Sequence, residues 1–295
     1  MTGSNASAPV YADIAAAEVE QPALSPFTPN FTLLTSANTG VWIGGSGRVF
    51  GTRDMDLVYV RDMPGTITLD ASFNRGGDEI VLRGNASQWT ILRDGSTARL
   101  SDEDTNVIIP FGQAGAALIF ADGIRFLNYD TNGDPKIGSQ TIDAAPAPVS
   151  SEPFDGYYLG IDAEMSDTSI LLTSPGNPVF ISANAPLRIY GTDGKEHIIL
   201  TSGTVQLDGS FNRGGDTVTF DLSADNITVE LYGSLARFHS ERGPPLEVSI
   251  PIGVVGIELE FEEGSAILKY DVASNNYTID QQIITAEPAA LSIFG

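Results

Sequence analysis

A ten-residue stretch that occurs twice constrains the fold of this chain more than any other feature. Residues 69–78 read LDASFNRGGD, and residues 207–216 read LDGSFNRGGD. These two copies, called the decapeptide below, differ at one position and lie 138 residues apart. A match of this length between distant parts of one chain indicates an internal repeat. We therefore expect two units of the same fold, each containing a polar, glycine-bearing turn.

Short apolar clusters, separated by Gly, Asp, Asn or Ser, predict an all-β fold. The clusters are rich in β-branched and aromatic residues, which is typical of strands. No segment keeps a helical period for more than about two turns. In the first half of the chain the clusters lie at 33–34, 41–43, 48–50, 57–60, 66–69, 80–82, 89–92, 98–100, 107–109, 118–120 and 124–127.

The similarity between the two halves extends beyond the decapeptide. Residues 33–36 match residues 171–174, and RVFGT at 48–52 matches RIYGT at 188–192. The spacing changes only slightly along the chain, as small loop insertions would cause. The predicted organisation is a flexible N-terminal segment (1–30), a first β repeat domain (31–144), a Pro- and Ser-rich linker (145–168), a second β repeat domain (169–286) and a C-terminal tail (287–295).

Two architectures agree with this pattern. Early in each half the clusters recur about every nine to ten residues, which suits the rungs of a β-solenoid or β-roll. Asp-Gly pairs at 94–95 and 122–123 indicate antiparallel hairpins. The main prediction is therefore two tandem domains that are β-solenoid- or β-roll-like with antiparallel hairpins. Two β-sandwiches of about 110 residues each are the alternative.

The charge balance narrows the range of partners. The chain has 38 acidic and 15 basic residues, a formal net charge of −23. Such a surface repels phosphate backbones and anionic lipids, so no nucleic-acid partner is expected. It favours cations such as Ca²⁺. The chain has no Cys and only two His, which leaves little for disulfides, zinc or a Ser-His-Asp triad. No apolar run approaches the roughly 20 residues of a membrane span, so no membrane insertion is expected.

Oxygen-bearing side chains at four-residue spacing make the decapeptide a candidate calcium site. Carboxylate and amide oxygens are calcium ligands. The same Asx residues, with glycines, also build tight turns without any metal. The sequence leaves both interpretations open. The candidate ligands are Asp70, Asn74 and Asp78 in the first copy and Asp208, Asn212 and Asp216 in the second.

A third candidate calcium site follows the last strand clusters of the first half. Asp130, Asn132 and Asp134 resemble the first three ligand positions of an EF-hand loop. Pro135 stands where that loop has Gly, and Thr141 stands where it has a bidentate Glu. These departures weaken the match.

The pattern of residues 48–58, with Asp54 and Asp56, followed by the decapeptide, resembles modules of large secreted surface proteins of Gram-negative bacteria. These include adhesins and S-layer-like proteins, and they often carry haemolysin-type (repeats-in-toxin) calcium units. The calcium nonapeptide of that family is absent here. The resemblance implies calcium as the cofactor, a location at the bacterial cell surface and export by a type I route that needs no signal peptide. Residues 1–7 indeed lack a basic region followed by an apolar core.

Three classes of function follow from these observations. The favoured one is an extracellular structural protein, an adhesin or S-layer-like, that associates with itself or with a cell-surface component and is not an enzyme. A carbohydrate-binding module is the first alternative, with Trp42, Tyr59 and Trp89 stacking on sugars, although their places within strand clusters favour the core. The second is a polysaccharide-active β-helix enzyme that uses acidic residues and Arg75 or Arg213, and the duplication argues against it.

Overall fold

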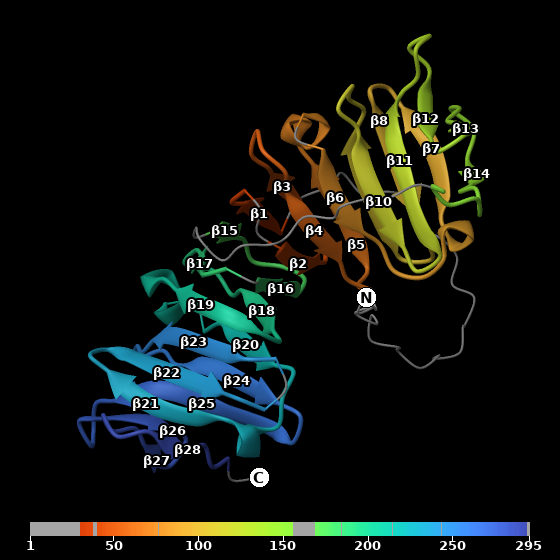
Figure 1. The fold of residues 1–295 in the computed structure, drawn as a ribbon. Coiled ribbons are helices and arrows are strands. Elements are labelled where there is room, and N and C mark those ends of the chain that lie inside the picture. Colours follow the sequence, from red (N-terminus) through yellow and green to blue (C-terminus); the bar gives the residue numbers. More distant parts are fainter. Residues whose placement is uncertain are drawn as a thin grey trace.

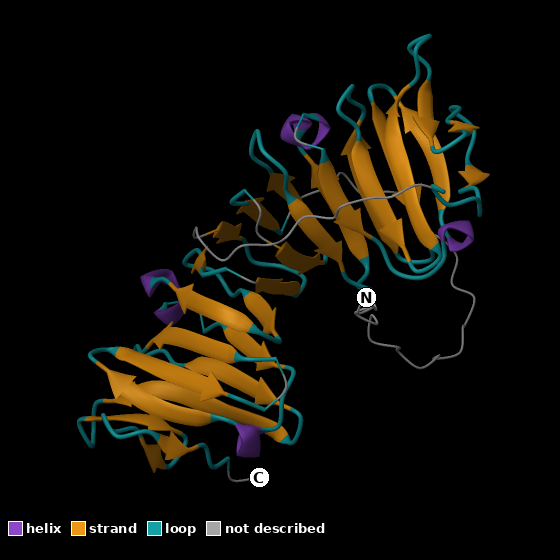
Figure 2. Cartoon of the chain, in the orientation of Figure 1, coloured by secondary structure: helices purple, strands orange, loops and turns teal. Residues whose placement is uncertain are grey.

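Strands dominate the computed structural model, which describes residues 30–37, 40–75, 77–155, 169–183, 185–213, 215–242 and 244–293. The prediction of an all-β fold is confirmed. Within the described residues the strands form two mixed sheets of 14 strands each, called sheet A and sheet B (Figure 1). The helices there are single 3₁₀ turns at the ends of strands (Figure 2): η1 (Ala71–Asn74), η2 (Ala86–Gln88), η3 (Gly209–Asn212) and η4 (Ala224–Asn226).

Sheet A contains, in spatial order, β14 (Ala147–Pro148), β7 (Thr90–Asp94), β8 (Thr97–Ser101), β9 (Thr105–Pro110), β5 (Gly65–Leu69), β3 (Gly47–Phe50), β1 (Phe31–Leu34), β15 (Ser169–Thr173), β17 (Leu187–Tyr190), β19 (Gly203–Leu207), β23 (Leu246–Pro251), β22 (Leu235–Ser240), β21 (Thr228–Tyr232) and β28 (Ala289–Ala290).

Sheet B contains, in the same direction, β13 (Gln140–Thr141), β12 (Pro135–Ile137), β11 (Gly123–Tyr129), β10 (Ala116–Phe120), β6 (Asp78–Val81), β4 (Leu57–Val60), β2 (Gly40–Gly44), β16 (Val179–Ala183), β18 (His197–Leu200), β20 (Thr217–Phe220), β24 (Ile257–Phe261), β25 (Gly264–Asp271), β26 (Asn276–Ile279) and β27 (Gln282–Ile283).

The chain begins each half by crossing between the two sheets after every strand. Strands β1, β3, β5 and β9 of sheet A are parallel neighbours, and so are β2, β4, β6 and β10 of sheet B. Antiparallel strands then extend each sheet outward, β8 and β7 in sheet A and β11 to β13 in sheet B. The second half follows the same course from β15 to β28.

The core lies between the two sheets because every strand alternates between inward and outward side chains. In β2, for example, Val41 and Ile43 are fully buried, whereas Trp42 between them faces outward and is half-buried. The inward residues of both halves form one continuous hydrophobic cluster. Burial of the apolar face of each sheet against the other is therefore what holds the two layers together.

The two halves meet at the middle of the molecule through their first strands (Figure 1). There β1 pairs antiparallel with β15, and β2 pairs antiparallel with β16. Leu33 lies opposite Leu171 and Ile43 lies opposite Ile181, and each of these pairs joins residues in equivalent positions of the two halves. An approximate twofold axis therefore passes through the junction, perpendicular to both sheets.

Both predicted hairpins are confirmed, with each turn displaced by one residue. Asp94 pairs with Thr97, so Gly95 and Ser96 form the first turn, and Gly95 has a positive φ of 62°. Phe120 pairs with Gly123, so residues 121–122 form the second turn.

The segments predicted as linker and tails contribute little regular structure. Residues 147–148 of the predicted linker form edge strand β14, and Val149 behind it is buried. Residues 289–290 of the predicted tail form the matching edge strand β28. The predicted flexible segment 1–30, apart from Asn30, lies outside the described residues, as do residues 156–168. In the described part of the chain no helix has the length and apolar character to cross a membrane.

Candidate functional site

The decapeptide lies between a strand of sheet A and a strand of sheet B, and its first acid builds the turn. Asp70 is the N-cap of η1 and accepts hydrogen bonds from Ser72 N (3.1 Å) and from the Ser72 hydroxyl. It also accepts one from Gly51 N (3.2 Å), on the preceding strand connection. Asp208 does the same for η3, with Ser210 N at 3.1 Å. The turn-building role predicted for these two acids is confirmed.

The asparagine of the decapeptide bonds to a later strand connection, the one that follows β9. Asn74 Nδ2 donates to the carbonyl of Phe111 (3.0 Å). Gly112 follows Phe111, and a Cβ there would meet the backbone of Asn74. In the second half Gly253 packs in the same way against Asn212. The decapeptide, between β5 and β6, therefore contacts the connection after β3 and the connection after β9. These three connections pack together as one corner.

The last acid of the first decapeptide belongs to a buried acid pair rather than to the turn. Asp78 and Asp56 are both fully buried, and Asp78 Oδ1 accepts from Asp56 N (2.8 Å). The Asp56 carboxylate accepts from Thr52 N (2.6 Å) and from Thr35 Oγ1 (2.7 Å). Burial raises the pKa of Asp56, the threonine hydrogen bonds oppose that rise, and nearby Asp70 adds to it.

The second half contains the equivalent pair, Glu196 and Asp216, both fully buried. Asp216 Oδ1 accepts from Glu196 N (2.8 Å), and Glu196 Oε1 accepts from Thr192 N (3.0 Å) and from the Thr192 hydroxyl. The two carboxyl groups also contact each other, and burial together with Glu196 raises the pKa of Asp216 to about 7. Among the described residues, Asp216 Oδ2 and Glu196 Oε2 have no donor. A proton shared between the two carboxyl groups satisfies both oxygens.

These pairs define what the acids can do chemically. A carboxyl pair with one raised pKa is the arrangement used for general acid–base catalysis. Here all four carboxyl groups are sealed from solvent, so no substrate reaches them. Their hydrogen bonds hold neighbouring strand connections together, and the raised pKa values of Asp56 and Asp216 favour the protonated form of those two groups. Sequence reasoning missed Glu196 and gave Asp56 no role of its own, although both follow a Gly-Thr pair by four residues.

The EF-hand-like candidate forms a tight hairpin loop between β11 and β12. Asp130 Oδ1 accepts from Asn132 N (2.8 Å) and Asp134 N (3.0 Å). These backbone bonds, and then Lys136, lower the pKa of Asp130. The carboxylate therefore closes the loop on its own backbone.

The nine predicted calcium ligands are not gathered into one kind of site. Asp70 lies near the Asp56 carboxylate and Asp78 bonds to the Asp56 backbone N–H, whereas the Asn74 side chain bonds to Phe111. Within the described residues no three acidic or histidine side chains converge as a metal centre requires. The ligand sets read from the sequence thus do not fit a calcium cage in this structure, and calcium binding stays a prediction.

The three aromatic residues considered for sugar stacking occupy two different environments. Trp89 is buried, and its Nε1 donates to the carbonyl of Arg83 (2.9 Å). Trp42 and Tyr59 lie on the outer face of sheet B, half-buried, with their rings stacked at 4.2 Å and 7°. Only the Trp42–Tyr59 pair is thus placed on a surface.

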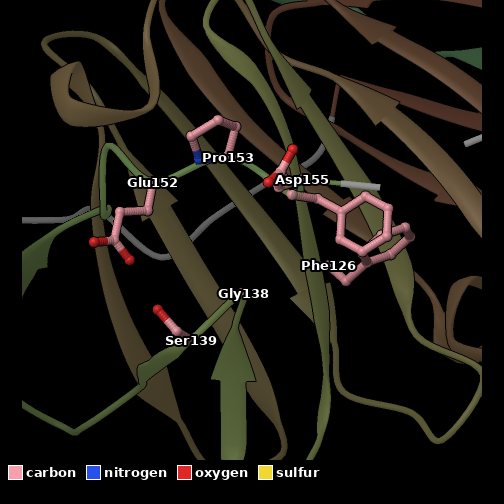
Figure 3. Close-up of a pocket in the computed structure, with 7 residues that line it drawn as sticks. Phe126, Gly138, Ser139, Glu152, Pro153 and Asp155 are labelled. Atoms are coloured by element: carbon pink, nitrogen blue, oxygen red, sulfur yellow. The ribbon is translucent and has the colours of Figure 1, made fainter. Parts of the chain in front are cut away.

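Two shallow pockets lie among the residues that the structure describes. One, of about 240 Å³, lies at the outer end of the first half, against Phe126 and Phe154. Its carboxylates, Glu152 and Asp155, lie on separate sides (Figure 3). The other, of about 370 Å³, lies on the outer face of sheet A beside Arg188 and Tyr190. Neither pocket brings an acid, a base and a nucleophile together.

Comparison with known proteins adds no assignment. No protein-family model matches this chain, and no curated protein matches it. The resemblance to secreted bacterial surface proteins therefore stays a prediction.

Proposed function

We propose that this protein is a non-catalytic structural component of a bacterial cell surface, adhesin-like or S-layer-like, that associates with copies of itself or with the cell envelope. One observation carries the proposal. In both copies of the decapeptide the first acid, Asp70 or Asp208, caps a 3₁₀ turn and accepts a hydrogen bond from the preceding strand connection. Duplication of such a unit enlarges a rigid body and adds no reactive group.

The architecture supports a mechanical role. We also propose that each half is a solenoid-like unit and that the two halves arose by tandem duplication. The alternating course between the sheets supports the first part, and the shared strand order supports the second. The two sheets continue across the junction, so the halves form one extended layer pair. At both ends sheet A finishes in a two-residue strand, a device that discourages uncontrolled edge pairing.

Calcium and export belong to the same proposal. The net charge of −23 makes copies of the chain repel one another, and divalent cations reduce such repulsion. Type I export and an extracellular location follow from the resemblance to secreted bacterial surface proteins. Calcium would then act between exposed acids of neighbouring molecules.

The test is a calcium titration of the full chain followed by EDTA. We expect Ca²⁺ to increase particle size in light scattering and to raise the melting temperature, and EDTA to reverse both. Mg²⁺ at equal ionic strength is the control for plain screening. If neither quantity responds, calcium leaves the proposal; a chain that stays monomeric with and without calcium contradicts self-assembly.

A second candidate function rests on the outward aromatic pair. Trp42 and Tyr59 present a stacked, half-buried aromatic surface on a flat sheet, and such surfaces bind sugar rings. If the protein is a carbohydrate-binding module, a glycan array gives hits that Trp42→Ala removes and that a substitution of exposed Tyr232 leaves in place. An array without hits dismisses this candidate.

A further inference from the structure

The outer face of sheet A carries an apolar patch at the junction of the two halves. Leu34, Phe50, Ile170 and Leu172 are 42%, 38%, 37% and 44% exposed. They lie on β3, β1 and β15, which together with the next strand, β17, occupy the middle of the molecule (Figure 1). With the other outward residues of these strands they form the central patch: Thr32, Leu34, Arg48, Phe50, Ile170, Leu172, Arg188 and Tyr190.

The strand register fixes how the members of the central patch are arranged. One row across the strands reads Phe50, Leu34, Ile170, Arg188. The adjacent row reads Arg48, Thr32, Leu172, Tyr190. The patch is therefore a rectangle whose centre is mainly aliphatic. The two arginines occupy one diagonal pair of corners, and the two aromatic residues occupy the other.

The two corner arginines keep their positive charge without a neighbouring carboxylate in the described part of the chain. Among the described residues neither Arg48 nor Arg188 forms an ion pair, whereas Arg99 and Arg237, farther out on the same face, both do. Arg188 instead donates to Gln206 Oε1 (3.0 Å) and lies beside the Tyr190 hydroxyl (3.4 Å). The patch thus offers two guanidinium groups without a carboxylate partner in the described part of the chain.

This arrangement is complementary to itself. Two copies can stack with their central patches face to face, related by a twofold axis that runs parallel to the sheets and between them. The rectangle of one copy then lies over the same rectangle of the other copy, reversed along one of its two directions. Each arginine corner then faces an aromatic corner, and the aliphatic centre faces an aliphatic centre. This holds for an axis along the strands and for an axis across them. A guanidinium group is attracted to the face of an aromatic ring, and in this pairing no two arginines face each other.

We infer that the central patch is the interface through which two copies of this chain form a face-to-face dimer. The inference rests on the self-association part of the proposed function and names its surface. The pocket beside Arg188 and Tyr190, about 370 Å³, receives a corner side chain of the second copy. The outward residues of β5 and β19, including Thr204 and Gln206, form the rim of the contact.

Sedimentation velocity over a wide range of concentrations tests the inference. We expect the wild-type chain to dimerise, and Leu34→Glu and Leu172→Glu each to raise the dissociation constant about a hundredfold, since each change enters a twofold interface twice. Val272→Glu, at a residue that is 66% exposed outside the patch, is the matched control and leaves the dimer intact. Arg48→Ala and Arg188→Ala weaken it less than the glutamates do. Circular dichroism melting shows that all variants fold.

Engineered cysteines supply a readout that does not depend on weakening the contact, because the chain has no native Cys. Leu34→Cys protein mixed with Ile170→Cys protein cross-links if the axis runs along the strands, and Leu34→Cys with Thr32→Cys cross-links if it runs across them. Failure of both mixtures overturns the inference. Oligomers that tolerate both glutamate variants overturn it too, while the proposed self-assembly stands. A wild-type monomer at every concentration overturns both.

Discussion

Replacing Gly253 by alanine lowers the free energy of unfolding by about 3 kcal/mol, because the added Cβ has no room. A Cβ at this position lies 2.6 Å from the carbonyl oxygen of Asn212 and 2.7 Å from its Cβ. The carbonyl belongs to the backbone of η3, which Asp208 and Ser210 fix, so it cannot move aside cheaply. Thermal denaturation followed by circular dichroism shows the loss as a melting temperature lower by roughly 6 to 12 °C.

Gly209→Ala is the control for this prediction within the same corner. A Cβ at Gly209 has nothing within 4 Å, and the first copy of the decapeptide carries Ala71 at this place. Replacing glycine where the backbone allows alanine restricts the unfolded chain, so this variant gains about 0.5 kcal/mol. Equal effects of the two substitutions would show that the corner does not pack as the structure has it.

The strands and the corner were accessible from the sequence because both depend on local chemistry. Alternation of β-branched and aromatic residues placed β1 to β5 within a residue or two of their observed bounds. Asp70 and Ser72 lie two residues apart, and an Asx side chain at that spacing caps the following turn wherever it occurs. The identity of the two decapeptides then carried the conclusion from one half to the other.

The buried acid pairs could not be predicted from the sequence in this way, because the register of neighbouring strands decides which acids meet. Asp78 meets Asp56, and Asp216 meets Glu196, across neighbouring strands of sheet B that are joined by long connections. No spacing rule links residues 20 or 22 apart. The sequence therefore assigned Asp78 and Asp216 to the turns of their own decapeptides, where only Asp70 and Asp208 act.

The junction and the outward aromatics show the same limit. That β1 pairs antiparallel with β15 follows from how the second half turns back on the first, which no local pattern encodes. Trp42 was expected in the core from its place in a strand cluster. It faces outward because Val41 and Ile43, on either side of it, take the inward positions. A cluster of three apolar residues does not say which of its two faces is buried.

Between about pH 4 and pH 7 the wild-type protein becomes less stable as the pH rises, opposite to the trend of most carboxylates. Asp216 has a pKa of about 7 in the folded chain and an ordinary value near 3.8 when unfolded. The folded state therefore holds a proton that the unfolded state releases across this range, and each unit of difference is worth about 1.4 kcal/mol. The contribution is complete below pH 3.8 and is lost as the pH passes 7, about 4 kcal/mol in all. Urea denaturation at several pH values measures it.

Glu196→Gln isolates the cause of this trend. The glutamine keeps an acceptor for Thr192 and supplies an N–H to Asp216 Oδ2, so the shared proton is no longer needed. We expect this variant to match the wild type near pH 4, to exceed its stability at pH 8 by about 3 kcal/mol and to lose most of the slope between them. Asp193→Asn, at a side chain that is 85% exposed three residues away, leaves the slope unchanged. If the dependence of stability on pH is the same in Glu196→Gln as in the wild type, the proton is held elsewhere. The pKa of Asp56 in the first half is also raised, so Asp56→Asn is then the next variant to test.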